Sequence, residues 1–343
     1  MEKFLKKLLQ RKDIFSKFLQ FILQIIANIY NLVMVLRNIA FNNGYLTQYK
    51  AGVPVICLGN ISTGGTGKTP ATIWLAKKIE AMHLKRPIIL SRGYGGDEAQ
   101  IFQNRKIPQI LNSNRVEGAK QSILQYGNDI CILLDDGLQH RYLARDLNIV
   151  LIDALDPFGG GYVLPRGFLR ESPLALQRSN MIIITRSDMI SESQKIELEN
   201  KIHNFTTSPI WHASHTPTHF IDWETKQIIS LETQKNILAF CGLGNPNGFK
   251  ATLENIGYHD FPFITFQDHH AYSNQDKERL LKISTVNNSD VWITTEKDAV
   301  KLQPPFPKPI WVLEIEFKLL SQEDSFLNTI QNLLQKESPL KKI

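Results

Sequence analysis

The feature that most constrains the fold is a series of short apolar runs that begins near residue 53. These runs, rich in isoleucine, leucine and valine, lie at residues 53–59, 86–91, 129–135, 147–153 and 180–186. Helix-like stretches separate most of them, for example 69–83 and 115–126. Strands that alternate with helices are typical of a parallel sheet with helices on both faces. The sequence therefore predicts an α/β fold.

The first apolar run leads directly into the glycine-rich segment NISTGGTGKTP at residues 60–70. The P-loop pattern has a glycine where this chain has Ser62, but the later glycines still allow the tight turn. Backbone N–H groups at such a helix N-terminus face phosphate oxygens. A glycine-rich surface turn is the alternative, which the expected flanking strand and helix disfavour. The predicted ATP-binding residues are Ser62, Thr63, Gly64, Gly65, Thr66, Gly67, Lys68 and Thr69.

Within this loop, Lys68 is predicted to contact the β- and γ-phosphates and Thr69 to bind Mg²⁺. Asp135 and Asp136 close the third apolar run, and carboxylates at the end of a parallel strand near a P-loop are typical Mg²⁺ ligands. A helix cap or loop turn is the alternative for these two residues. Asp153 ends the next run and is a weaker candidate, for which capping serves equally well.

The N-terminal segment carries the whole positive excess of the chain. Residues 1–50 hold eight basic and two acidic residues, a difference of six, and the net charge of the full chain is +6. Residues 18–36 carry no charge, and Gln20, Gln24, Asn28 and Asn31 recur on one helical stripe. This pattern favours a helix that lies in a membrane interface, with lysines against anionic headgroups. A helix docked on the protein's own core and a true membrane span are the alternatives.

From residue 207 the alternation of apolar runs and a helical stretch resumes on a smaller scale. We therefore predict three parts: a membrane-associated helical segment at 1–45, a P-loop domain at 46–206 and a smaller α/β domain at 207–335. The three cysteines, Cys57, Cys131 and Cys241, lie in or beside apolar runs, as expected of reduced core thiols in a cytosolic protein. A nucleic-acid-binding protein would more often spread its basic residues over a folded face.

The chain resembles the tetraacyldisaccharide 4′-kinases of lipid A biosynthesis in a series of segments that follow the family's order. They are GNISTGGTGKTP (59–70), SRGYGG (91–96), GDEA (96–99), DDGLQH (135–140), PRGFLRES (165–172), GLGNPNGF (242–249), FQDHHAY (266–272) and TTEKDAVKL (294–302). The P-loop alone is unspecific, whereas SRGYG, DDGLQH, LRE and DHH together are highly specific. The basic, apolar N-terminus also looks like the family's membrane-associated helix.

The resemblance implies transfer of the ATP γ-phosphoryl group to the 4′-hydroxyl of a tetraacylated glucosamine disaccharide 1-phosphate. It implies a P-loop kinase domain plus a smaller α/β domain, with the reaction between them, at the cytoplasmic leaflet of a Gram-negative inner membrane. ATP and Mg²⁺ are the implied cofactors, and no nucleic-acid partner is expected.

One departure from the family concerns the candidate catalytic aspartate. About twenty residues usually separate SRGYG from the GDE motif there, but here the two are fused as SRGYGGDEA, and Ala99 replaces the usual proline. The resemblance aligns Asp97 with the catalytic aspartate, which makes it the candidate base, and pairs it with His269, which would tune the carboxylate or relay the proton. His270 is the alternative partner. Without the resemblance, Asp97 would be interpreted as a turn residue.

By resemblance, Gln139, Arg170 and Glu171 belong to the acceptor side of the site, where an arginine fork suits phosphate oxygens. A surface ion pair is the alternative for Arg170 and Glu171. Three histidines, His212, His215 and His219, do not share one helical face, and Pro217 disfavours a helix there, so we expect no metal site among them.

Two other functions remain open. A membrane-bound P-loop nucleotide switch that recruits partners is the first, but Thr63 stands where partitioning ATPases carry their extra lysine. A soluble small-molecule kinase, whose N-terminal helix merely packs on the protein, is the second.

Overall fold

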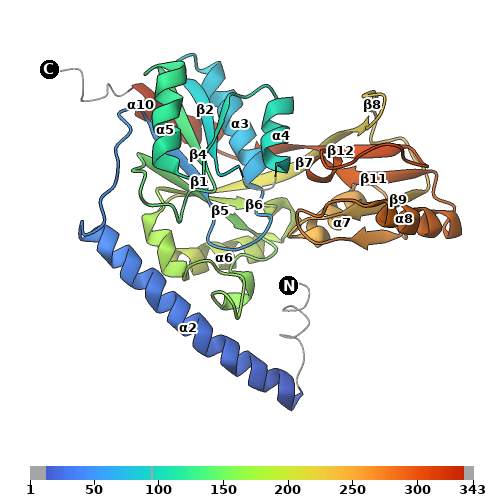
Figure 1. Cartoon of the computed structure of the whole chain (residues 1–343), viewed down its shortest axis with the longest axis horizontal. Helices are drawn as coiled ribbons and strands as arrows, with labels where there is room; N and C mark the ends of the chain where they lie inside the picture. The colour runs from blue at the N-terminus through green and yellow to red at the C-terminus, as the bar shows by residue number, and fades with distance from the viewer. Residues whose placement is uncertain (1–12, 94–95, 336–343) are drawn as a thin grey trace.

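The computed structural model describes residues 13–93 and 96–335 (Figure 1). These residues form a 12-stranded sheet in the order β10-β9-β11-β12-β7-β6-β5-β1-β4-β2-β3, with β8 paired to β7. Helices cover the faces of this sheet (Figure 1). The predicted α/β fold with a largely parallel sheet is confirmed.

The first half of the sheet is built from alternating strands and helices, and its strand pairs from β3 to β7 are parallel. Its strands are β1 (Val55–Gly59), β2 (Arg86–Ser91), β3 (Gln109–Leu111), β4 (Ile130–Asp135), β5 (Leu147–Asp153) and β6 (Met181–Thr185). Its helices are α3 (Lys68–Ala81), α4 (Asp97–Asn104), α5 (Arg115–Tyr126) and α6 (Glu192–His203). Short 3-10 turns lie at η1 (Gly159–Gly161), η2 (Pro173–Arg178) and η3 (Ser187–Met189).

The second half continues the same sheet through one long strand. Its strands are β7 (Ile210–Asp222), β8 (Ile228–Ile229), β9 (Ile237–Cys241), β10 (Phe263–Thr265), β11 (Val291–Thr295) and β12 (Ile310–Leu319). Its helices are α7 (Pro246–Asn255), α8 (Asn274–Val286), α9 (Glu296–Ala299) and α10 (Glu323–Gln335). Strand β7 pairs in parallel with β6 and antiparallel with β12, so it belongs to both halves.

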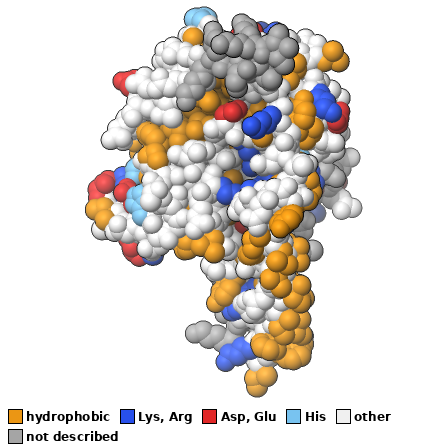
Figure 2. Space-filling model, turned by 90° about the vertical axis from the view of Figure 1, so that its left-hand side faces the viewer, with side chains coloured by type: hydrophobic (Ala, Val, Ile, Leu, Met, Phe, Trp, Pro, Cys, Tyr) orange, Lys and Arg blue, Asp and Glu red, His pale blue; other side chains and the backbone are white. Residues whose placement is uncertain are grey.

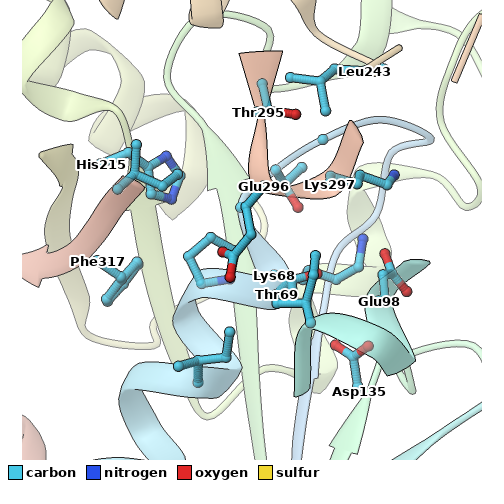
Figure 3. Close-up of a pocket in the computed structure, with 18 of the residues that line it drawn as sticks. Lys68, Thr69, Glu98, Asp135, His215, Leu243, Thr295, Glu296, Lys297 and Phe317 are labelled. Atoms are coloured by element: carbon cyan, nitrogen blue, oxygen red, sulfur yellow. The ribbon is translucent and has the colours of Figure 1, made fainter. Parts of the chain in front are cut away.

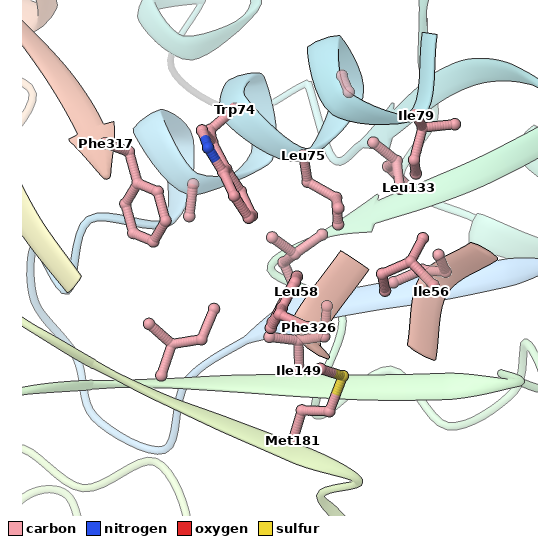
Figure 4. Packing of buried hydrophobic residues seen from close by; sticks show 14 of the residues in the cluster. Ile56, Leu58, Trp74, Leu75, Ile79, Leu133, Ile149, Met181, Phe317 and Phe326 are labelled. Atoms are coloured by element: carbon pink, nitrogen blue, oxygen red, sulfur yellow. The ribbon is translucent and has the colours of Figure 1, made fainter. Parts of the chain in front are cut away.

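The main core lies between α3 and the central strands (Figure 4). Trp74 and Leu75 on α3 belong to the same buried cluster as Leu58 of β1, and Phe326 of α10 packs there against the Trp74 ring. The last helix of the chain therefore packs into the core of the first half. The division into units at 46–206 and 207–335 stays a prediction. The three cysteines are buried, as core thiols should be.

The apolar runs predicted as strands are buried on both faces, which explains why they are nearly continuous in sequence instead of alternating. Because the strands are parallel, their carboxyl ends lie on one edge of the sheet. The segments that follow β1, β4, β5 and β6 therefore meet at this edge, although more than a hundred residues separate the first from the last.

The N-terminal helix α2 (Ile14–Asn42) lies along the outside of the molecule (Figure 1). Asp13 caps it, since its carboxylate accepts a hydrogen bond from the Ser16 backbone N–H at 2.9 Å. The helix is long and apolar enough to cross a membrane. Its hydrophobic side chains form an exposed stripe on the projecting end of the molecule (Figure 2). The basic residues before position 13, which are predicted to face lipid headgroups, lie outside the described residues.

Candidate active site

A cavity of about 710 Å³ lies at the carboxyl edge of the sheet, between its two halves (Figure 3). The P-loop residues Gly64 to Thr69 line one side. Asp135, Asp136 and Arg170 line it from the first half, and His269 and Lys297 from the second. The fold thus gathers most of the candidate residues around one space.

The P-loop runs from the end of β1 to the first turn of α3. Gly67 immediately precedes the helix with φ of 81°, a left-handed conformation that favours glycine. Hydrogen bonds fix the loop from neighbouring segments: Thr185 Oγ1 donates to the Thr66 carbonyl at 3.0 Å, and the Thr63 N–H donates to the Phe168 carbonyl at 2.6 Å. Neighbouring segments therefore fix the backbone of the loop at Thr63 and Thr66.

Arg186 is a contributor to this loop that we did not predict. Its guanidinium donates to the Gly65 carbonyl at 2.7 Å and also pairs with Asp153, which accepts a hydrogen bond from Asn245 at 2.9 Å. Asp153 thus joins the P-loop to the second half of the sheet, and its carboxylate is occupied by protein donors. The signal in the sequence was only the polar string TRSD at the end of an apolar run.

Asp136 lies between two cations. Its carboxylate is 3.5 Å from Lys68 Nζ and accepts hydrogen bonds from Arg170 Nη1 at 2.7 and 2.8 Å. Burial by itself would raise the pKa of Asp136, but the charges of Lys68 and Arg170 hold that pKa well below its usual range. Asp136 therefore stays ionised and orients both cations at the mouth of the P-loop.

Asp135, at the end of β4, has a different environment. It is fully buried, and burial together with the negative charges of Glu98 and Asp136 raises its pKa to about 7. Thr72 Oγ1 donates to this carboxylate at 3.3 Å. Among the described residues, no cluster of three histidine, cysteine or acidic side chains forms a metal site. His212, His215 and His219 all lie on β7, and the expectation that they form no metal site stays a prediction.

Asp97 and His269 meet across the cavity from segments 172 residues apart. His269 Nδ1 lies 2.9 Å and 3.1 Å from the two carboxylate oxygens of Asp97. His270 lies elsewhere, since its ring stacks on Phe266 and its Nε2 contacts Asp276 at 3.0 Å. The structure thus brings His269, and not His270, to Asp97. Tyr94 and Gly95, inside the fused motif that precedes Asp97, lie outside the described residues.

The two members of this pair differ in exposure. The Asp97 side chain is 0% exposed, whereas that of His269 is 43% exposed. The hydrogen bond to Asp97 raises the pKa of His269. The Nε2 atom of His269 is 3.4 Å from Lys297 Nζ, and Lys297 also pairs with Asp268 at 3.0 Å. Since an ammonium can only donate, this contact fits a neutral ring with its proton on Nδ1.

Helix α2 contacts the predicted acceptor residues. Tyr30 donates to the Arg170 carbonyl at 2.7 Å, and Arg37 donates to the Gln139 carbonyl at 2.9 Å. The Gln139 side chain donates to the Asn60 carbonyl at 3.0 Å. Glu171 is buried and pairs with Arg178 at 2.8 Å, while Asn38 of α2 donates to its other oxygen at 2.7 Å. The side chains of Gln139 and Glu171 are thus bound by other residues of the protein. Arg170 lines the cavity, where its guanidinium donates to Asp136.

His215 of β7 lies against the P-loop, close enough to Gly67 that a Cβ there would clash with its ring. Burial lowers the pKa of His215 to about 3, so the folded protein holds this ring neutral. The unfolded chain takes up a proton below the ordinary pKa of 6.5, and the folded chain does so only near 3. The contribution of His215 to stability is therefore fully present above pH 6.5 and is lost progressively as the pH falls towards about 3.

We expect the free energy of unfolding to fall by roughly 1.4 kcal/mol per pH unit through this window on account of His215 alone. Denaturant unfolding of the wild type and of His215→Gln between pH 7 and pH 4 measures the difference. A shallower dependence in the variant is expected, and an identical slope in both proteins would contradict this role for His215.

Comparison with known proteins agrees with the motifs. The sequence model of the family described as tetraacyldisaccharide-1-P 4′-kinase matches residues 19–104 and 96–335. A protein of Halothermothrix orenii named tetraacyldisaccharide 4′-kinase is 33% identical, over 93% of this chain and 92% of its own. A protein of Syntrophus aciditrophicus with the same name is 32% identical, over 92% and 93%.

Among solved structures, a crystal structure of LpxK from Aquifex aeolicus in complex with ATP resembles the fold with a TM-score of 0.70. It is 27% identical and covers 92% of this chain and 99% of its own. The family match spans nearly the whole described chain and includes both sides of the cavity. The chain therefore belongs to the tetraacyldisaccharide-1-P 4′-kinase family.

Proposed function

We propose that this protein transfers the γ-phosphoryl group of ATP to the 4′-hydroxyl of a tetraacylated glucosamine disaccharide 1-phosphate, a step of lipid A biosynthesis. The observation that carries the proposal is that Lys68 of the P-loop and His269, whose ring contacts Asp97, line one cavity in a chain of this family. A phosphate donor on one side and a proton acceptor on the other are what such a transfer requires.

The donor side of the site is the P-loop. Backbone N–H groups of Gly64 to Gly67 would surround the phosphates, and Lys68 would neutralise charge on the β- and γ-phosphates. Lys68 is held 3.5 Å from Asp136, so little side-chain freedom is lost when ATP binds. The donor set of the loop and of Lys68 supports ATP as the phosphate source.

Mg²⁺ fits the residues on the same side. Asp135 is a buried carboxylate whose negative neighbours oppose its ionisation, and a divalent cation would relieve this repulsion. Thr69, in the first turn of α3, would supply a hydroxyl ligand. Asp136 is already paired with Lys68 and Arg170, so its negative charge would stabilise the ion without Asp136 being its main ligand. When bound, Mg²⁺ neutralises charge on the phosphate oxygens.

The acceptor side uses the Asp97–His269 pair. Because Asp97 is enclosed and His269 is half exposed, we assign first contact with the hydroxyl to His269 Nε2. The hydroxyl proton moves to Nε2, the oxygen forms a bond to the γ-phosphorus, and the bond from that phosphorus to the bridging oxygen of ADP breaks. Asp97 stabilises the resulting imidazolium through Nδ1–H. Arg170 would bind the phosphate group, while Gln139 and Glu171 hold the surrounding loops in place.

Labelled ATP tests this function directly. We expect label on the 4′-position of tetraacylated disaccharide 1-phosphate and little on its fully deacylated counterpart. Equal labelling of both would favour a soluble sugar kinase. Nucleotide-dependent binding to vesicles with no labelled lipid would favour the membrane-bound switch.

Membrane association rests on α2. Ile14, Phe18, Phe21, Ile29, Leu32 and Leu36 are exposed apolar side chains of this helix. The polar side chains of Tyr30, Arg37 and Asn38 contact the protein body instead. One face of α2 thus contacts the rest of the protein, and its apolar face points outward. This arrangement favours a helix that inserts into the surface of a bilayer over one that crosses the bilayer. Since ATP is consumed, the leaflet would be the cytoplasmic face of the inner membrane.

We expect replacement of Ile25, Ile26 and Leu32 by glutamine to release the protein from anionic vesicles. Burial contributes roughly 1.5–3 kcal/mol for each apolar side chain, so binding should weaken by at least about 10²-fold. Vesicle co-sedimentation measures the effect. A matched control replaces three exposed apolar residues of the body, Leu124, Ile196 and Ile228, and should bind as the parent does. Undiminished binding of the α2 variant would rule out this face as the anchor.

A further inference from the structure

A second lysine lies next to the Asp97–His269 pair. Lys301 follows α9, and its Nζ is 3.9 Å from Asp97 Oδ2 and 3.0 Å from Asp298 Oδ1. Its side chain is only 13% exposed, although it carries a full charge. A long cationic side chain held in the interior normally has a partner that fixes it there. Asp298 is that partner, and Asp97 is the second carboxylate within its reach.

Asp298 is itself fixed from several directions. It is fully buried, and its carboxylate accepts hydrogen bonds from the Gly242 N–H at 3.0 Å, from Tyr272 Oη at 2.8 Å and from Thr295 Oγ1 at 2.8 Å. Burial, and then the charge of Asp298, raises the pKa of Tyr272, so the phenol remains a donor. Asp298 therefore ties together the loop after β9, the loop that carries His269 and the turn that carries Lys301.

We propose that Lys301 is a positioning residue of the phosphoryl-transfer site, which keeps the Asp97 carboxylate ionised and turned towards His269. The inference rests on the proposed role of the Asp97–His269 pair. Asp97 has no contact with solvent, so its charge is stable only if the protein supplies compensating charge. His269 contacts Asp97 through Nδ1, but it carries a compensating charge only when its ring is protonated.

Other charged groups also surround the pair, and Lys297 acts on Asp97 through its charge. The ammonium of Lys297 pairs with Asp268 at 3.0 Å on the Nε2 side of His269, whereas that of Lys301 lies 3.9 Å from the Asp97 carboxylate itself. Asp268 and Glu98 are nearby negative groups that interact with Lys297, and Asp268 also lies 3.8 Å from His269 Nε2. Burial raises the pKa of Asp97, and the hydrogen bond from His269 with the charges of Lys297, His269 and Lys301 more than reverses this.

The test is the pH profile of kcat/KM for the acceptor, measured with the full chain. Activity requires that the Asp97–His269 pair can still accept the hydroxyl proton, so activity is lost when the pair is protonated at low pH. Lys301→Met removes a positive charge beside Asp97, which makes the pair easier to protonate, and should move the acidic limb of the profile upward by about one pH unit. One unit is the low end of the pKa shifts that an opposite charge within about 4–6 Å causes, and we expect the low end because Asp298 partly neutralises Lys301. Lys301→Arg should return the limb to its wild-type position.

Lys282→Met, at an exposed position of α8, is the matched control and should leave the profile unchanged. A lower kcat with an unmoved limb in Lys301→Met would overturn the proposal, because loss of packing alone does not shift a titration. If Lys301→Met unfolds, Lys301→Gln serves in its place under the same criterion. Asp97→Asn distinguishes failure of the proposed catalytic pair from failure of the role of Lys301. A nearly active Asp97→Asn protein would refute the catalytic pair. An inactive Asp97→Asn protein, together with an unmoved acidic limb in Lys301→Met, would refute only the role of Lys301.

Discussion

A Lys68→Ala variant is expected to lose phosphoryl transfer by about 10²–10³-fold or more while keeping its fold. The magnitude follows from removal of a preorganised cation that acts on charge developing at the transferred phosphoryl group. The fold should survive because Lys68 contacts Asp136, and Asp136 keeps its two hydrogen bonds to Arg170 when Lys68 is gone. Steady-state kinetics with labelled ATP, together with the Tm, measure both expectations.

The control for this variant is Lys120→Ala, which removes an exposed lysine that pairs with Glu117 on its own helix, and an exposed pair of this kind contributes little. It should be as active as the wild type. A folded Lys68→Ala protein with wild-type turnover would end the kinase assignment, since no other described lysine lies at the first turn of α3.

The second large effect concerns Asp97 and His269. Each single alanine variant should lower kcat by roughly 10²–10⁴-fold, the contribution of a positioned general base. ATP affinity should change little, because the P-loop, Asp135 and Asp136 are untouched. The double variant should be scarcely worse than the more damaged single variant, since groups that act as one unit are not additive. Single-turnover rates for the four proteins complete this cycle.

His270→Ala is the matched control, because it removes the neighbouring ring, which contacts Asp276 instead of Asp97. Its kcat should stay close to that of the wild type. Losses that multiply in the Asp97–His269 double variant would mean independent roles. A nearly silent Asp97→Ala would direct attention to the neighbouring Glu98, which also lines the cavity.

The parallel α/β fold could be predicted from the amino-acid sequence, because buried parallel strands must be apolar along their whole length and leave continuous runs. It also located the P-loop and Asp135 and Asp136, since a strand, its following loop and the next helix are close in sequence and their geometry is local. The amphipathic character of α2 was readable for the same reason: one period of 3.6 residues describes the whole helix. The ranges predicted for α3 and α5 agree with the observed helices within two residues.

Contacts between groups that are distant in the sequence could be identified only in the folded chain. The contact of Asp97 with His269 instead of His270 depends on a turn in which His269 has φ of 58°, and no pattern of apolar residues specifies such a turn. Lys301 and Arg186 were missed because their partners, Asp97 and the Gly65 carbonyl, are more than a hundred residues away. Glu171, predicted on the acceptor side, is enclosed by Arg178 and Asn38. Secondary structure follows from local periodicity, whereas a site follows from packing between segments that share no local signal.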